Sequence, residues 1–151
     1  MRESTTVNFK VTSATIPAKD LAAKLSLKPD REWLAGAARG AFGAIEKQHG
    51  FELESKLMPQ SSLEQHVGAM LDRLKPCAQL LGSLAKEVTV EFTCSVQRKR
   101  APFLHFDRDT MRWLAVMGAR LDIDTQIVSD PPPPAKAGGA GGAASGGTPT
   151  I

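Results

Sequence analysis

The sequence predicts an α+β fold, a two-layer sandwich in which a mixed or antiparallel sheet of about five strands carries helices on one face. Two stretches, residues 7–12 and 87–97, alternate apolar with polar residues, as a strand with one buried side does. A third stretch, residues 63–81, has apolar residues at helical spacing along one stripe. Such elements pack as two layers, which leaves the other side of the sheet open to water or to a partner.

The composition predicts one domain at residues 1–130 and a disordered tail at residues 131–151. The chain has 151 residues and a formal net charge of +3, which favours no class of partner. Prolines at 131–134 begin a segment of Ala, Gly and Ser that has too little apolar surface to fold. The polar start of the chain contains no apolar stretch typical of a signal or membrane span, so we expect a cytoplasmic protein.

The first third of the chain predicts a strand, a helix, a loop and a second strand. After the strand at residues 7–12, a helix begins near Pro17, which a first helical turn tolerates, and it ends before Pro29. Residues 50–55 alternate again and predict a short strand. Residues 30–48 are rich in glycine and lack a clear period, so we expect a long loop whose apolar residues turn inward: Trp33, Leu34, Phe42 and Ile45.

The middle of the chain predicts an interrupted helix and a long strand. Ser62 and Gln65 have the spacing of a capping box at the start of the helix. Pro76 removes a helical hydrogen bond and predicts a kink or a break at Lys75. The alternating strand at residues 87–97 follows.

The end of the chain predicts two further strands with a helix between them. A basic turn at residues 98–100 is too short for anything but a hairpin, so we expect an antiparallel strand at residues 102–106. Asp109 is expected to cap a helix that Gly118 closes, and residues 121–128 predict the last strand. The predicted order is β-α-β-α-β-β-α-β.

This succession of elements resembles a bacterial family of uncharacterised proteins, domain of unknown function 4279. The resemblance covers about residues 7–128 and rests on the order and spacing of its segments rather than on any single motif. It implies the same domain boundaries and a bacterial origin, and it implies no chemistry. The segments that carry it are the strand at 7–13, the helix at 20–27 with Lys28, Pro29, Asp30 and Arg31, then Gly36, the Leu74, Lys75, Pro76 step within 63–84, and the ending Leu121, Asp122, Ile123, Asp124.

Polar residues on the open sheet face are the candidate binding site. Asp122 and Asp124 stand two residues apart on a strand, which puts both carboxylates on one face about 7 Å apart. Such a pair suits a hard cation or acid–base work, although a solvated polar face has the same pattern. Trp33 is expected either in the core or at an interface. The residues predicted to contact a partner are Glu91, Thr93, Asp122, Asp124, Gln126 and Trp33.

The remaining motifs predict no catalytic residue, metal site or cofactor. The three histidines lack the spacing of metal ligands, and Cys77 and Cys94 are expected to be reduced and buried. Arg98, Lys99 and Arg100 form the only basic run. They are a weak candidate for nucleic-acid contact, because the predicted open face lacks the aromatic residues on which bases stack.

These observations favour a non-enzymatic module that binds another protein through its open sheet face. Within this class, an immunity or antitoxin protein that neutralises a toxin domain is the more specific hypothesis. The alternative is a small-ligand or metal-dependent enzyme, or a sensor, that uses the carboxylates of that face. Self-association through the sheet remains open, since exposed sheets also serve as dimer surfaces.

Overall fold

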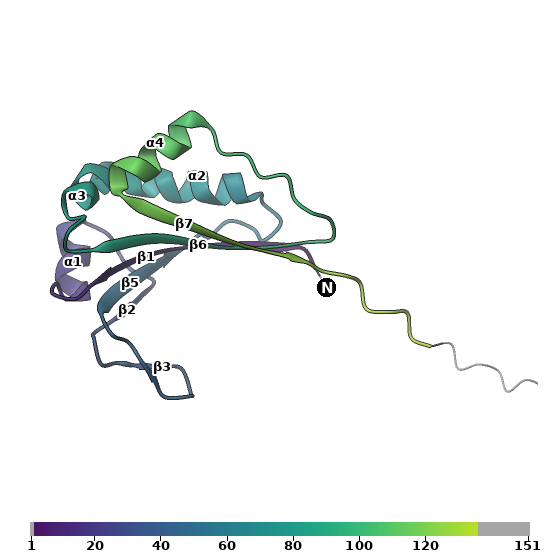
Figure 1. Ribbon diagram of the computed structural model, residues 1–151, viewed down its shortest axis with the longest axis horizontal. Coiled ribbons are helices and arrows are strands. Elements are labelled where there is room, and N and C mark those ends of the chain that lie inside the picture. The colour runs from purple at the N-terminus through teal and green to yellow at the C-terminus, as the bar shows by residue number, and fades with distance from the viewer. Residues whose placement is uncertain (1, 136–151) are drawn as a thin grey trace, which may run out of the picture.

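The protein folds into the two layers that the sequence predicts. A computed structural model describes residues 2–135. A five-stranded mixed sheet with the strand order β2-β5-β1-β6-β7 forms one layer, and helices cover one of its faces (Figure 1). The α+β sandwich prediction is therefore confirmed. The strands are β1 (Ser4–Ser13), β2 (Arg31–Trp33), β5 (His49–Glu54), β6 (Thr89–Arg98) and β7 (Ala119–Ile127).

The central strand is β1, which pairs antiparallel with both β5 and β6. Strand β7 lies parallel to β6 at one edge, and the short β2 lies antiparallel to β5 at the other. Apolar side chains alternate along β1 and β6 and point toward the helices, where Phe9 and Phe92 pack with ring centroids 5.3 Å apart. The core therefore lies between the sheet and the helical layer.

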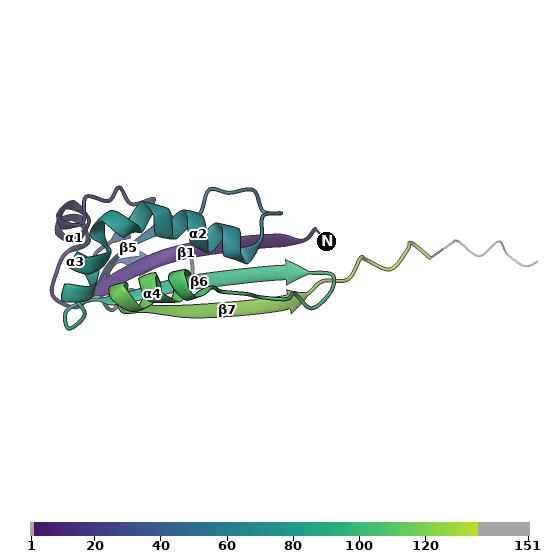
Figure 2. The ribbon, with the colours of Figure 1, turned by 90° about the horizontal axis from the view of Figure 1, so that it is seen from above.

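The helices of this layer start, break and end at the residues that the sequence marks. Ser62 and Gln65 form the predicted capping box of α2 (Leu63–Leu74). Pro76 lies in a 3₁₀ turn (Lys75–Cys77), which separates α2 from α3 (Ala78–Ser83) as the missing amide hydrogen requires. Helix α4 (Arg108–Met117) ends at Gly118 in a left-handed conformation. The first helix, α1 (Ala18–Lys24), packs at one end of the sheet beside β2 and β5 (Figure 2).

The prediction for residues 98–109 is wrong in two respects. Residues 101–107 form no strand; they run as a loop from the end of β6 up to α4 (Figure 1). In this loop Leu104 and Phe106 pack against the core while Phe103 is exposed. The N-cap of α4 is Asp107 rather than Asp109, since the carboxylate of Asp107 accepts a hydrogen bond from the Thr110 amide at 2.8 Å.

Residues 30–48 also differ from the predicted loop. They contain β2 and a two-stranded hairpin, β3 (Ala38–Arg39) with β4 (Ala44–Ile45). The expected inward packing of their apolar residues is wrong: Leu34, Phe42 and Ile45 are 56%, 100% and 65% exposed. Gly40 and Gly43, with φ of 67° and 77°, let the chain turn back before it reaches any core.

The terminal predictions fall partly outside the described residues. Residues 131–135 form no helix or strand and are exposed, and the rest of the predicted tail, 136–151, lies outside the part of the chain that the structure describes. No helix between residues 2 and 135 is both long and apolar enough to cross a membrane.

Candidate functional site

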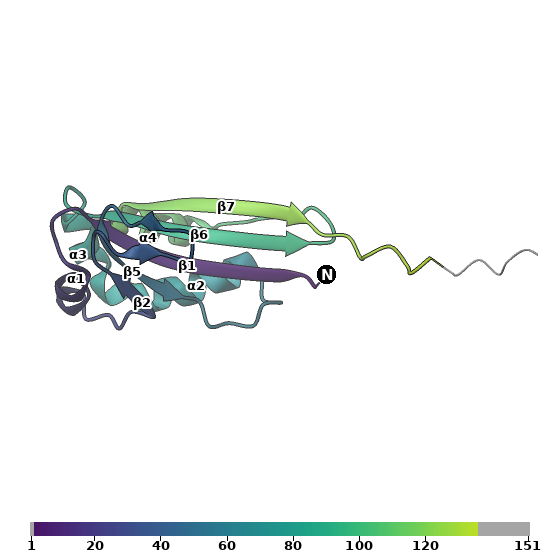
Figure 3. The ribbon, with the colours of Figure 1, turned by 90° about the horizontal axis from the view of Figure 1, so that it is seen from below.

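The sheet face opposite α2, α3 and α4 is the candidate site. Figure 3 shows this face with its strands in front of the helices. It carries the polar half of each alternating strand, because successive side chains of a strand point to opposite sides. We call it the open face, and the strand register defines its rows of neighbouring side chains.

One row of the open face is a ladder of alternating charge across all five strands. The register aligns Arg31 with Glu52, Glu52 with Lys10, Lys10 with Glu91, and Glu91 with Arg120. Ion pairs join Arg31 to Glu52 at 3.5 Å and Lys10 to Glu91 at 3.3 Å. The Glu91 carboxylate also lies 3.8 Å from Arg120. Opposite charges directly across neighbouring strands favour this register, and we call this row the charge ladder.

The Glu91 carboxylate of the charge ladder is paired with cations on both sides. The side chains of Lys10 and Glu91 are 27% and 19% exposed, so water screens this pair less than it screens a surface pair. Arg120 Nε donates a hydrogen bond to Asp122 at 3.0 Å, which raises the pKa of the Arg120 guanidinium above its usual value. Arg120 thus lies beside both the Glu91 and the Asp122 carboxylates.

Trp33 contributes an aromatic surface at the β2 edge of the open face, opposite the β7 edge. The register places it opposite Gly50, and a Cβ at Gly50 would lie 2.5 Å from the indole ring, so the ring covers that glycine. The indole NH donates to the Gln48 carbonyl at 3.1 Å, and the Arg31 guanidinium stands 4.8 Å from the ring centroid. Trp33 is therefore fixed and half-buried on the open face, outside the core between sheet and helices.

The β3–β4 hairpin forms an arm that extends from the sheet on the side away from the helical layer (Figure 1). We define the arm as residues 34–48. The Glu46 amide donates to the Ala37 carbonyl and the Gly36 amide donates to the Glu46 carbonyl, which closes the base of the arm. Arg39 pairs with Glu46 at 3.4 Å. Phe42 stands at its tip and is 100% exposed. The arm thus holds a large apolar ring in water beside the open face.

A groove of about 460 Å³ separates the arm from the sheet. Its floor comes from β1 and β6 and includes the Lys10 and Glu91 pair of the charge ladder. Its wall comes from the arm and adds both signs of charge. The lining residues are Lys10, Thr12, Thr89 and Glu91 from the sheet, and Arg39, Ile45, Glu46, Lys47 and Gln48 from the arm.

The six residues that the sequence predicts for partner contact all belong to the open face. Thr93 aligns with Asp122, and Gln97 aligns with Gln126, on the polar side of β6 and β7. Glu91 lies in the groove, whereas Trp33 lies at the far side of the sheet. Asp124 accepts a hydrogen bond from Gln126 at 3.2 Å. Within residues 2–135, no three His, Cys, Asp or Glu side chains are grouped so that they could hold a metal ion.

The three residues of the basic run, 98–100, have different contacts. Arg98 belongs to β6, and its guanidinium donates to the Thr5 hydroxyl at 2.7 Å and to the Ser61 carbonyl at 3.4 Å. Lys99 pairs with Asp130 at 3.0 Å, and Arg100 is exposed in the loop that follows. Two of the three charges thus have partners within the protein.

Several residues of the site were not predicted from the sequence. Lys10, Arg31 and Arg120 carry the cations of the charge ladder, and Phe42 carries the exposed ring of the arm. The signal for Phe42 is present in the sequence, since glycines stand two residues before it and directly after it, as they do in a tight turn. No comparable local signal marks the ladder, because its members come from five separate strands.

Comparison with known proteins identifies a family for this fold and site. Residues 3–128, which include all of the sheet and its helices, match the family model described as Domain of unknown function (DUF4279). No curated protein and no solved structure matches the chain. Since the match spans well over half of the chain, the protein belongs to the DUF4279 family.

Proposed function

We propose that this protein is a non-enzymatic module that docks another protein through its open face and arm. The observation that carries the proposal is the complete exposure of Phe42 at the arm tip. Leaving a Phe side chain in water rather than burying it forgoes about 2–3 kcal/mol. A partner with an apolar pocket recovers this free energy, which is why exposed aromatic anchors dominate many interfaces.

The open face supplies charged, aromatic and polar side chains beside this aromatic anchor. The charge ladder offers cations and anions in alternation, so it complements a partner surface of mixed charge and penalises one of a single sign. Trp33 is held rigidly by Gln48 and Gly50 and loses little entropy on contact. Glu91, Thr93, Asp122, Asp124 and Gln126 form the polar surroundings in this proposal.

The test is capture of a binding partner by the full chain, followed by measurement of its affinity with purified proteins. Phe42→Ser is expected to weaken binding about 30-fold, which corresponds to about 2 kcal/mol. Phe103→Ser is the matched control, because Phe103 is also exposed, at 88%, but lies in the loop between β6 and α4 rather than in the arm. Equal affinities of the two variants would overturn the proposal.

The more specific form of the proposal is an immunity or antitoxin protein that acts in the cytoplasm. It is supported by a broad face with an adjoining arm, a shape that suits covering the working surface of a toxin domain. Two buried free thiols, Cys77 and Cys94, also suit a reducing compartment. The expected result is that coexpression with the partner rescues growth of the host and that Phe42→Ser abolishes the rescue. A partner that is harmless when expressed alone would reject this form.

A second candidate function is a small-ligand or metal-dependent enzyme, or a sensor, that uses the carboxylates of the open face. The groove beside Glu91 favours it, since about 460 Å³ accommodates a small molecule between charged walls. This candidate predicts that divalent ions raise the melting temperature of the protein. It also predicts that Asp122→Asn combined with Asp124→Asn abolishes this response, and a melting temperature indifferent to divalent ions would remove its metal-dependent form.

A further inference from the structure

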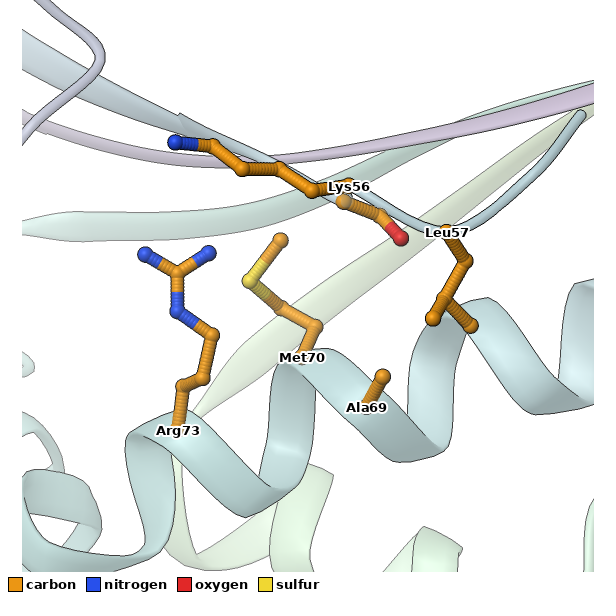
Figure 4. A pocket seen from close by; sticks show the side chains of 6 residues that line it. Lys56, Leu57, Ala69, Met70 and Arg73 are labelled. Carbon is orange, nitrogen blue, oxygen red and sulfur yellow. The ribbon is translucent and has the colours of Figure 1, made fainter.

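A second cavity lies away from the open face, between α2 and the segment that follows β5. It has a volume of about 250 Å³. Most of its wall is hydrocarbon from Leu57, Ala69 and Met70, of which Met70 is 1% exposed and forms the buried floor. Figure 4 shows the cavity from close by; the residues that line it are Ser55, Lys56, Leu57, Ala69, Met70 and Arg73.

The cavity has a cationic end and an apolar end. The tips of Lys56 and Arg73 lie on the same side of it, whereas Leu57 and Ala69 lie on the other (Figure 4). Lys56 Nζ is paired with Asp30 at 3.0 Å, so their charges offset each other. Arg73 Nη1 donates to the Glu54 carbonyl at 3.3 Å, and no carboxylate of residues 2–135 lies within 4.0 Å of its guanidinium. The cationic end therefore retains the charge of Arg73.

The polar groups beside the cavity already have hydrogen-bond partners, although the charge of Arg73 adds, after those bonds and Lys56, to the lowering of the Asp30 pKa. The Ser55 hydroxyl is hydrogen bonded to His66 Nδ1 at 2.7 Å, and His66 Nε2 is bonded to the Met58 carbonyl at 3.1 Å. Asp30 also accepts a hydrogen bond from the Glu54 amide at 2.8 Å, and this bond, followed by that of Lys56, lowers the pKa of the Asp30 carboxyl. Asp30 thus holds the Lys56 ammonium at the rim of the cavity.

The shape and charge of the cavity define a class of ligand. An apolar slot with a guanidinium at one end suits a molecule with a hydrocarbon tail and one carboxylate, because the planar fork of Arg binds both carboxylate oxygens. At about 30 Å³ for each water-sized group, the volume holds about eight heavy atoms. We propose that this cavity binds a short aliphatic monocarboxylate, with the carboxylate on Arg73 and the chain against Met70, Ala69 and Leu57. Hexanoate has the matching size.

The experiment titrates the intact protein with hexanoate while the backbone amides are observed by NMR. Saturable shifts centred on residues 55–57 and 69–73 are expected, with affinity in the millimolar range because the ligand is small. Hexylamine has the same number of carbon atoms with the opposite charge, and acetate has the charge without the long chain. Both are expected to bind at least ten times more weakly. Equal shifts with hexylamine, or shifts spread over the whole protein, would overturn the proposal.

Two variants assign the binding to the two ends of the cavity. Arg73→Gln removes the charge, and Ala69→Leu fills the apolar end from a half-buried position of α2; each is expected to weaken hexanoate binding at least tenfold. Arg112→Gln is the matched control, because Arg112 is an exposed arginine on α4. Circular dichroism verifies that the variants fold. Unchanged binding in a folded Arg73→Gln protein would overturn the proposal, as would tighter binding of the dipeptide Gly-Leu, which would assign the cavity to peptide carboxyl termini.

Discussion

Lys10 and Glu91 face each other across β1 and β6, with Nζ and Oε2 3.3 Å apart at the centre of the open face. Both side chains are more than two-thirds buried, at 27% and 19% exposed, although they lie on the side of the sheet that no helix covers. Neighbouring side chains of the sheet and the arm provide this burial, since both residues line the groove. The same pair thus lies across the β1–β6 register and forms part of the floor of the groove.

We predict that Lys10 and Glu91 are energetically coupled. In a double-mutant cycle with Lys10→Ala and Glu91→Ala, measured by urea unfolding, the coupling is expected to be about 1 kcal/mol. The control cycle uses Lys75 and Asp72, which pair at 3.1 Å within the helical layer but are 38% and 74% exposed. Its coupling is expected to be about 0.3 kcal/mol, because water screens an exposed pair. Additive effects at Lys10 and Glu91 would show that the ladder is not stabilising.

His66 is predicted to make stability fall in mild acid. It is 1% exposed, and burial lowers its pKa in the folded protein, while the hydrogen bond to the Met58 carbonyl acts in the opposite direction. In the unfolded chain its pKa is about 6.5. The unfolded state therefore binds the proton more readily. The contribution of neutral His66 to the free energy of unfolding is complete above about pH 6.5 and is lost as the pH falls through the folded pKa.

The measurement is the urea midpoint at pH 7.5 and pH 5.5. The midpoint is expected to fall between these values in the unmodified protein. The fall should be smaller in His66→Gln, which also lowers stability at pH 7.5 by about 1–3 kcal/mol because Ser55 and the Met58 carbonyl lose a buried partner. His105→Gln is the control, since His105 is exposed. A midpoint that responds to pH equally in all three proteins would exclude His66 as the source.

The sequence predicts the layers of this fold well because each depends on local periodicity. Alternation identifies β1 and β6, and the Ser62 and Gln65 pair identifies the start of α2. Periodicity also identifies which residues face the solvent, which is why the predicted partner-contact residues of β6 and β7 lie on the open face, whereas Trp33 came from a segment without a clear period. It does not identify strand order, so the charge ladder, whose members Arg31 and Arg120 lie at opposite edges, could not be predicted.

Two of the wrong predictions, the strand at residues 102–106 and the inward packing of the apolar residues of 30–48, have separate physical causes. Apolar residues in a segment indicate that it can be buried, but they do not indicate that a place in the core is available. The edge of the sheet beside β6 is occupied by β7, so residues 102–106 cannot add a strand there. In the arm, glycines reverse the chain before Phe42 can reach the core, which leaves its ring in water. In the first segment the arrangement of distant strands overrides the local pattern, and in the arm the glycine turn does.

Both thiols are predicted to be unreactive until the protein unfolds. Cys77 and Cys94 are buried and free. Burial raises the pKa of both thiols, that of Cys94 to about 12, and the charge of Asp122 acts in the same direction on Cys94. Since the thiolate is the reactive form, Ellman's reagent at pH 8 should modify neither residue in buffer and both in urea. Rapid reaction of one thiol in buffer would reveal local opening at that site.

Two glycines in helices are predicted to respond oppositely to substitution by alanine, because their surroundings differ. A Cβ at Gly82 in α3 would clash with the backbone oxygen of Val116 in α4, so Gly82→Ala must push the two helices apart. It is expected to destabilise the protein by about 3 kcal/mol, at the upper end of overpacking effects.

Gly68→Ala is the matched substitution, because Gly68 lies within α2 and a Cβ there would have no heavy atom within 4 Å. It is expected to raise stability by about 0.5–1 kcal/mol, since alanine restricts the unfolded chain and favours the helix. Urea unfolding of both variants measures the difference, and α4 leads directly into β7, so Gly82→Ala should also shift the amide resonances of β7. If Gly82→Ala were as stable as Gly68→Ala, the contact between α3 and α4 would be looser than described.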